Sequence, residues 1–135
     1  MEDKIFGTLA FNIGWTRKCN VVWWNKEIAI DIRVSCYQTE VPNEKQQEAF
    51  AKFISSTECF SEKMKDVLNI YINKQYGYTP KSIWDFLKID EVLFFQNGNY
   101  AVICSPLEIL EDDIVILVSG TEIKIGGGFL IEFQS

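Results

Sequence analysis

The sequence predicts an α+β domain in which three strands, two helices and five further strands follow one another. Alternating apolar and polar residues, typical of half-buried strands, occur in both the N-terminal and C-terminal parts of the chain. Apolar residues at helical spacing are confined to the middle. Strands grouped before and after helices favour an α+β fold over a doubly wound parallel sheet. We therefore expect one domain, residues 1–135, with an antiparallel β-sheet (order βββ-αα-βββββ) and a two-helix hairpin packed on one face.

Three strands are predicted near the N-terminus, over about residues 5–13, 18–24 and 28–36. The third is the clearest, because isoleucine, valine and cysteine alternate with polar or small residues along its whole length. A tight polar connection at Asn25-Lys26 separates it from the second strand. Short turns between consecutive strands indicate an antiparallel meander.

The first helix is predicted over about residues 43–55, after Pro42. Asn43 is a suitable N-cap, and Gln46 stands three residues later, as in a capping box. Ser61 is the expected N-cap of the second helix, which runs to about Gln75. We expect the pair to cover the apolar face of the sheet.

The C-terminal part returns to strands after a short helical turn capped by Ser82. Asn97-Gly98 predicts a type I′ hairpin turn, in which both central residues take positive φ. Three consecutive glycines, residues 126–128, indicate a bend and lack the spacing of a phosphate-binding loop. The predicted strands are residues 92–95, 100–104, 114–118, 122–125 and 129–133.

The charge is divided unevenly along the chain. Residues 1–81 carry 11 basic and 10 acidic residues, whereas residues 82–135 carry 2 and 9, which accounts for the net charge of −6. Because the acidic part is also predicted to be strands, we expect a sheet with acidic residues on its exposed face. Such a surface repels nucleic acid and attracts a basic partner.

Several functional classes are disfavoured by what the sequence lacks. The chain has no histidine, which excludes the Ser–His–Asp and Cys–His arrangements, and no S-x-x-K motif occurs. Neither a Walker loop nor a dinucleotide-binding loop is present. We therefore expect no enzymatic activity, no catalytic residues, no metal site and no cofactor. The four cysteines, expected to be reduced and mostly buried, are Cys19, Cys36, Cys59 and Cys104.

The N-terminal residues and the hydropathy favour a cytoplasmic protein. The sequence from Met1 to Lys4 lacks the basic segment of a signal peptide, and no apolar stretch follows it. No apolar run approaches the roughly 20 residues that a membrane-spanning helix needs. We expect no contact with membranes.

The densest acidic cluster is Glu111-Asp112-Asp113, with Glu108 three residues upstream. A solvated loop before a hydrophobic strand is its simplest interpretation, and partner binding is the main alternative. Metal binding is less favoured, since the spaced ligands and glycine of a calcium loop are missing. Most aromatic residues are expected in the core, but Trp24 and Tyr78 are candidates for an exposed aromatic contact.

The layout resembles an uncharacterised bacterial domain family, some of whose members are encoded near polymorphic toxin systems. The shared features are Phe6-Gly7-Thr8-Leu9 in the meander, Gln46 to Phe50 in a helix, the tyrosine-rich segment from Tyr71 to Tyr78, and the acidic turn entering a strand from Glu111 to Leu117. Family members tend to carry an acidic–His–Gly turn where this chain has Asp112-Asp113-Ile114. The resemblance therefore implies an immunity-protein-like role without metal or catalytic chemistry at that turn.

These observations favour a non-enzymatic binding protein that neutralises a toxin by presenting an acidic surface to a basic partner. The predicted partner-binding residues are Glu108, Glu111, Asp112, Asp113, Trp24 and Tyr78. The alternative is a ligand-binding or regulatory domain with an aromatic-lined pocket between helices and sheet.

Overall fold

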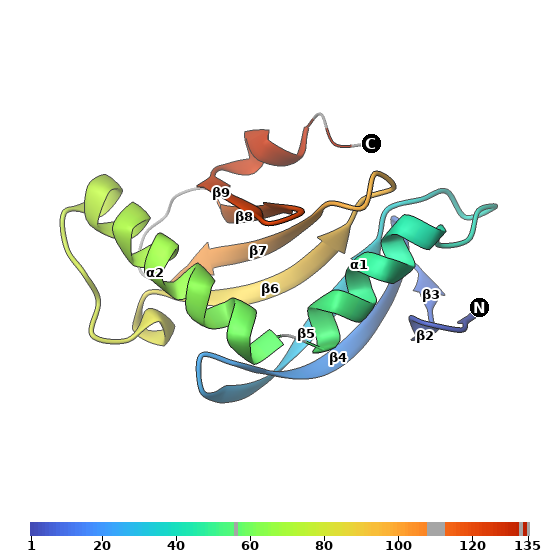
Figure 1. Cartoon of the computed structure of the whole chain (residues 1–135), viewed down its shortest axis with the longest axis horizontal. Helices are drawn as coiled ribbons and strands as arrows, with labels where there is room; N and C mark the ends of the chain where they lie inside the picture. The colour runs from blue at the N-terminus through green and yellow to red at the C-terminus, as the bar shows by residue number, and fades with distance from the viewer. Residues whose placement is uncertain (56, 108–112, 133, 135) are drawn as a thin grey trace.

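The computed structural model describes residues 1–55, 57–107, 113–132 and 134, and has the predicted α+β architecture (Figure 1). Two helices, α1 (Glu44–Ser55) and α2 (Thr57–Tyr76), separate an N-terminal from a C-terminal group of strands. The strands are β1 (Glu2–Asp3), β2 (Gly7–Thr8), β3 (Ala10–Phe11), β4 (Trp15–Trp23), β5 (Lys26–Val34), β6 (Leu87–Phe94), β7 (Tyr100–Pro106), β8 (Ile114–Ser119) and β9 (Glu122–Gly126). Short 3₁₀ helices are η1 (Ile83–Asp85) and η2 (Gly128–Ile131).

Seven strands, β3 to β9, form one sheet in the order in which they occur along the chain. All neighbouring pairs are antiparallel except β5 and β6, which are parallel, with Ile32 opposite Val92. The parallel pairing follows from the segment that joins the two strands, because α1 and α2 return the chain to the end of the sheet at which β5 begins. The predicted antiparallel sheet is therefore a mixed sheet made of two meanders joined by one parallel pair.

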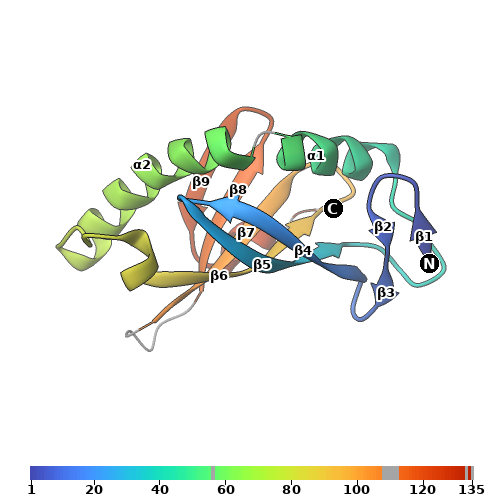
Figure 2. The same cartoon turned by 90° about the horizontal axis from the view of Figure 1, so that it is seen from below.

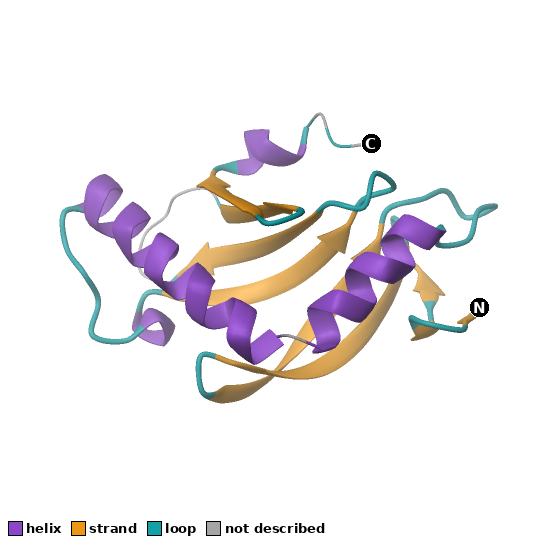
Figure 3. Cartoon of the chain, in the orientation of Figure 1, coloured by secondary structure: helices purple, strands orange, loops and turns teal. Residues whose placement is uncertain are grey.

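Both helices cover the same face of the sheet and form a second layer (Figures 2 and 3). They meet at an open angle across that face, so each helix packs mainly on the sheet beneath it (Figure 1). Their buried faces supply Phe50, Phe53, Met64, Leu68 and Ile72 to the core. This core is the main source of stability, since each such side chain contributes roughly 1.5–3 kcal/mol when it is fully buried.

The capping box predicted for α1 is confirmed. The Asn43 side chain accepts a hydrogen bond from the Gln46 backbone N–H at 2.9 Å, and Gln46 Oε1 accepts from the Asn43 backbone N–H at 2.9 Å. Gln46 is completely buried, and its Nε2 donates to the carbonyls of Ser35 at 3.0 Å and Phe94 at 3.2 Å. One side chain thus starts α1 and joins the ends of the two parallel strands.

The predicted first strand, residues 5–13, is wrong, because the chain folds there into a small hairpin, β1–β2, followed by the short β3. The Asp3 carboxylate accepts hydrogen bonds from the backbone N–H groups of Ile5 and Phe6 at 2.9 and 2.8 Å. Burial opposes a low pKa for Asp3, but these bonds lower it below the ordinary value. The hairpin turn inserts Phe6 edge-on against Phe50, at 4.6 Å between ring centroids.

The turn between β4 and β5 lies one residue earlier than predicted, at Trp24-Asn25. Both residues have positive φ, 47° and 62°, as a type I′ turn requires. The Trp24 indole N–H donates to the Ser61 carbonyl at 2.5 Å, and its own carbonyl accepts from the Trp84 indole at 3.3 Å. Ser61 lies inside α2 and is therefore not its N-cap. Tertiary contacts hold a tryptophan in a conformation that asparagine or glycine would adopt more easily.

Both predicted C-terminal hairpins are present. The Asn97-Gly98 turn is not type I′, because only Gly98 has positive φ, 91°, and its N–H bonds to the Phe95 carbonyl at 3.0 Å. This pattern is a type I turn closed by a glycine bulge. The β8–β9 turn has positive φ at Gly120 alone, as in type II′.

The predicted last strand, residues 129–133, is also wrong over its described part, which forms η2. Leu130 and Ile131 pack against the second face of the sheet, where the apolar residues are Ala101, Val115 and Leu117. A strand continuing β9 would leave this patch uncovered. The glycine bend thus serves to turn the chain back over the sheet.

Candidate functional site

The six predicted partner-binding residues have different outcomes. Glu108, Glu111 and Asp112 lie outside the described residues. Asp113 is exposed, and Tyr78 is 47% exposed. Trp24 is only 5% exposed, so its predicted role as an exposed contact is wrong. The cause is the type I′ turn, which directs its indole to Ser61 rather than to solvent.

Tyr78 and Asp113 lie at the same end of the sheet, where β6 begins, β7 ends and β8 begins. The Tyr78 ring contacts Phe86 edge-on at 6.0 Å between centroids. The Phe86 carbonyl accepts a hydrogen bond from the Leu107 N–H at 2.8 Å. Leu107 is 50% exposed, so this end presents two apolar side chains to solvent.

Two carboxylates lie beside this apolar pair. The Ser105 hydroxyl hydrogen-bonds to Asp90 Oδ2 and is also 3.3 Å from Asp113 Oδ1. A hydroxyl carries one proton, so it can neutralise neither charge and donates fully to only one carboxylate. Burial, with the added effect of the two aspartates, raises the pKa of the neighbouring Cys104 thiol. We call Tyr78, Leu107, Asp90 and Asp113 the acidic end.

The acidic end contains little compensating positive charge. Lys88 Nζ lies 3.8 Å from Asp90 Oδ1, near the limit for an ion pair, and both side chains contact solvent. Such an exposed pair contributes little to stability and is screened by salt. The net charge of the described carboxylates and Lys88 is −1, and the sequence of the adjoining segment 108–112 adds three acidic residues.

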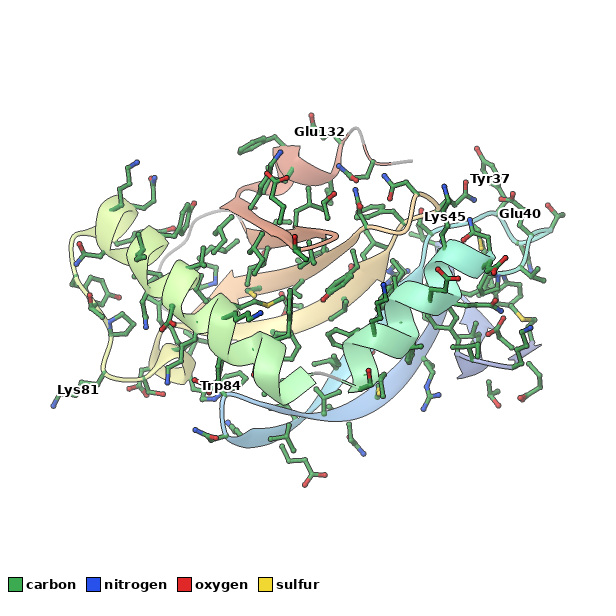
Figure 4. All side chains as sticks on the ribbon, in the orientation of Figure 1. Tyr37, Glu40, Lys45, Lys81, Trp84 and Glu132 are labelled. Atoms are coloured by element: carbon green, nitrogen blue, oxygen red, sulfur yellow. The ribbon has the colours of Figure 1, made fainter. Side chains whose placement is uncertain are left out.

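The predicted acidic sheet face does not form among the described residues. The outward side chains at the centre of β7 and β8 are apolar and lie under η2. Glu91 pairs with Arg33 at 3.0 Å, and Glu122 with Lys124 at 3.7 Å. The carboxylates of these strands are thus paired with basic side chains. Glu132 lies just after η2, at the top of the molecule in Figure 4. The pattern of side chains along a strand could not reveal that a C-terminal segment covers this face.

A second exposed surface was missed by sequence reasoning. Ile13 is 85% exposed with φ 53°, and Tyr37 is 79% exposed. They border a groove of about 490 Å³ at the ends of β5 and β6, whose wall includes Phe11 and Leu93. The Arg33 guanidinium donates to the carbonyls of the turn that holds Ile13. A β-branched residue at positive φ is a conformational outlier, and the only available signal was Gly14 after an apolar run.

Other kinds of site have little support in the described residues. No three metal-ligating side chains of the described chain lie close enough together to hold an ion. Within the same residues, no helix is both long and apolar enough to cross a bilayer.

Cys19 and Cys36, predicted to be buried, are free and half-exposed, whereas Cys104 is free and buried, and the Cys59 side chain lies outside the described part of the chain. Comparisons with protein-family models, characterised proteins and solved structures find no significant match to this chain.

Proposed function

We propose that the protein is a non-enzymatic binding protein that neutralises a basic protein partner in the cytoplasm, as an immunity protein neutralises its toxin. The observation that carries this proposal is the acidic end. It combines exposed Tyr78 and Leu107 with the carboxylates of Asp90 and Asp113. Aromatic side chains are frequent anchors of protein interfaces, and surrounding charge selects the sign of the partner.

The acidic end suits the two stages of association differently. Carboxylates exposed at a turn attract a basic partner over about a Debye length, which raises the association rate at low salt. The apolar pair then loses its contact with water, which slows dissociation. The role of the acidic residues is therefore tested by kinetics rather than by affinity alone.

The first experiment asks whether a partner is captured through the acidic end. The protein, immobilised as bait, is exposed to a lysate of the source organism beside the variant Glu111→Lys, Asp112→Lys, Asp113→Lys. A matched control makes the same charge change at exposed acidic residues elsewhere: Glu27→Lys, Glu62→Lys and Asp66→Lys. We expect a basic protein to be retained by the wild type and the control but not by the first variant. Equal retention by all three baits contradicts the proposal.

The second experiment measures association with the captured protein after purification. The triple change at residues 111–113 should slow association about tenfold or more at low salt and much less at high salt. Tyr78→Ala should mainly accelerate dissociation. An unchanged association rate in the triple variant would show that the cluster only solubilises the loop.

A nucleic-acid partner is the opposite case and has a direct test. A mobility-shift assay at low salt, where electrostatic attraction is strongest, should detect no binding of DNA or RNA. A shift would overturn the interpretation of the charge.

A further inference from the structure

A cleft of about 460 Å³ lies between α1 and the turns of the two C-terminal hairpins. It is at the opposite end of β7 from the acidic end, since Tyr100 begins that strand and Ser105 lies near its last residue. The close approach of α1 to the β6–β7 turn defines one wall, where a Cβ built on Gly98 would lie 3.4 Å from the Lys45 Cβ. The volume is within the range of sites that hold small organic molecules.

Three aromatic rings form the apolar part of the cleft. Tyr100 lies 5.6 Å from Phe53 and 6.3 Å from Phe60 between ring centroids, and all three line the cavity. Phe53 is 2% exposed and Tyr100 8%, so Phe60, which is partly exposed, offers the main ring surface on which a planar ligand can stack.

Tyr100 supplies a polar group as well. The residue is only 8% exposed, and within the described chain its hydroxyl has no hydrogen-bond partner. The hydroxyl is not among the fully buried unpaired polar atoms of the described residues, so it keeps some contact with solvent at the cleft wall, and a ligand can take the place of water there. A ligand atom that accepts a hydrogen bond would satisfy it.

The rim on α1 carries more positive than negative charge. Lys45 and Lys52 are seven residues apart, about two turns, so they lie on the same side of the helix roughly 10 Å apart along its axis. Glu48 lies between them, which leaves a local net charge of +1 on a protein whose net charge is −6. No carboxylate of the described residues lies within ion-pair distance of Lys45. Lys45 is therefore available to a ligand.

We propose that this cleft binds a small aromatic anion. The ring of the ligand stacks on Phe60 and Tyr100, its anionic group lies against Lys45, and an oxygen accepts the Tyr100 hydroxyl proton in a hydrogen bond. Phe60, with Tyr100 beside it, selects a planar body, and Lys45 selects a carboxylate, sulfonate or phosphate over a neutral group. This site is separate from the partner surface of the proposed function, and its test does not depend on finding a partner.

The test uses 2-naphthoate as the probe and neutral 2-naphthamide as its matched analogue, in calorimetric titrations of the full chain at low salt. We expect 2-naphthoate to bind with a dissociation constant below about 1 mM and the amide to bind at least about tenfold more weakly. Absence of naphthoate binding, or equal binding of the two compounds, would overturn the proposal.

Variants then place the binding in the cleft. Lys45→Gln should weaken 2-naphthoate binding about fivefold or more at low salt, and less as salt is raised. Tyr100→Phe removes only the hydroxyl and should weaken it about threefold or more without lowering the melting temperature. Lys81→Gln is the control, because Figure 4 shows Lys81 at the other end of the molecule from Lys45. Unchanged binding in both cleft variants, or an equal loss in the control, would refute the assignment.

Discussion

Gln46 gives the sharpest test of how the two halves of the fold are joined. Its side chain is completely buried and makes three hydrogen bonds, to the Ser35 and Phe94 carbonyls and to the Asn43 N–H. Gln46→Met keeps the length of the side chain and removes all three. The Phe94 carbonyl still accepts from the Ser35 N–H at 2.9 Å, and Asn43 is exposed enough for water to replace its partner. The Ser35 carbonyl loses its side-chain partner.

The expected loss of unfolding free energy follows from these three hydrogen bonds. The Ser35 carbonyl is partly buried, and an acceptor left there without a partner costs about 1–3 kcal/mol, whereas replacing a hydrogen bond by one to water costs less. The free energy of unfolding should therefore fall by about 2–3 kcal/mol, measured by urea denaturation with an unchanged m-value. Gln75→Met, at an exposed position of α2, is the control and should change it by less than about 0.5 kcal/mol. A loss below about 1 kcal/mol for Gln46→Met would refute the assignment of Gln46 as the joining residue.

Gln46→Glu adds a dependence on pH. The new carboxylate would face two carbonyl oxygens in a buried site, so its pKa in the folded state should lie above its unfolded value of about 4.3. The folded state then binds more protons than the unfolded state, and stability falls as pH rises. The difference in unfolding free energy between this variant and the wild type should shrink as the pH is lowered from 7 towards 4. A difference independent of pH would mean that the carboxylate reaches water.

Further predictions concern the turns and the thiols. Gly98→Val places a β-branched residue at φ 91° against Lys45 and should lower the free energy of unfolding by at least about 1–2 kcal/mol, whereas an unchanged melting temperature would contradict the bulge. Ile13→Asn should raise the free energy of unfolding by about 0.5–1 kcal/mol, because asparagine tolerates positive φ. A decrease in that free energy would show that the exposed isoleucine makes stabilising contacts. Cys104 should react with a thiol reagent only after unfolding and Cys19 in the native state, as followed by mass spectrometry of the labelled peptides.

The order of elements could be predicted because local signals and tertiary structure agree over most of the chain. Asn43 and Gln46 specify the start of α1 through contacts within a single turn, and both bonds form as predicted. Disagreement arises where distant residues decide the conformation. Trp24 belongs to a strand by pattern, but the Ser61 carbonyl and the Trp84 ring draw it into the turn. The η2 segment is likewise apolar and β-like in sequence, and its contacts with the second sheet face are nonlocal.

The candidate sites were predictable to different degrees for the same reason. Tyr78 and Asp113 could be expected to be exposed because both lie in segments rich in turn-forming or charged residues. The cleft could not be predicted from the sequence, because Lys45 and Tyr100 are brought to the same cleft only by the parallel pairing of β5 with β6. That pairing is set by the length and path of the two helices, which no local pattern reports.

The parallel pair also explains why the two proposed sites can act independently. It places α1 over the ends of β5 and β6, beside the cleft, while the β6–β7 and β7–β8 connections alternate between the two ends of the sheet. Lysines of α1 therefore gather at one end of β7 and Asp90 and Asp113 at the other. A basic protein approaching the carboxylates is repelled by the opposite end, so the charge distribution orients it. Because β7 is paired with a neighbour on both sides and is buried from Tyr100 to Cys104, an aromatic anion in the cleft should leave partner association rates unchanged, and a change would indicate coupling through β7.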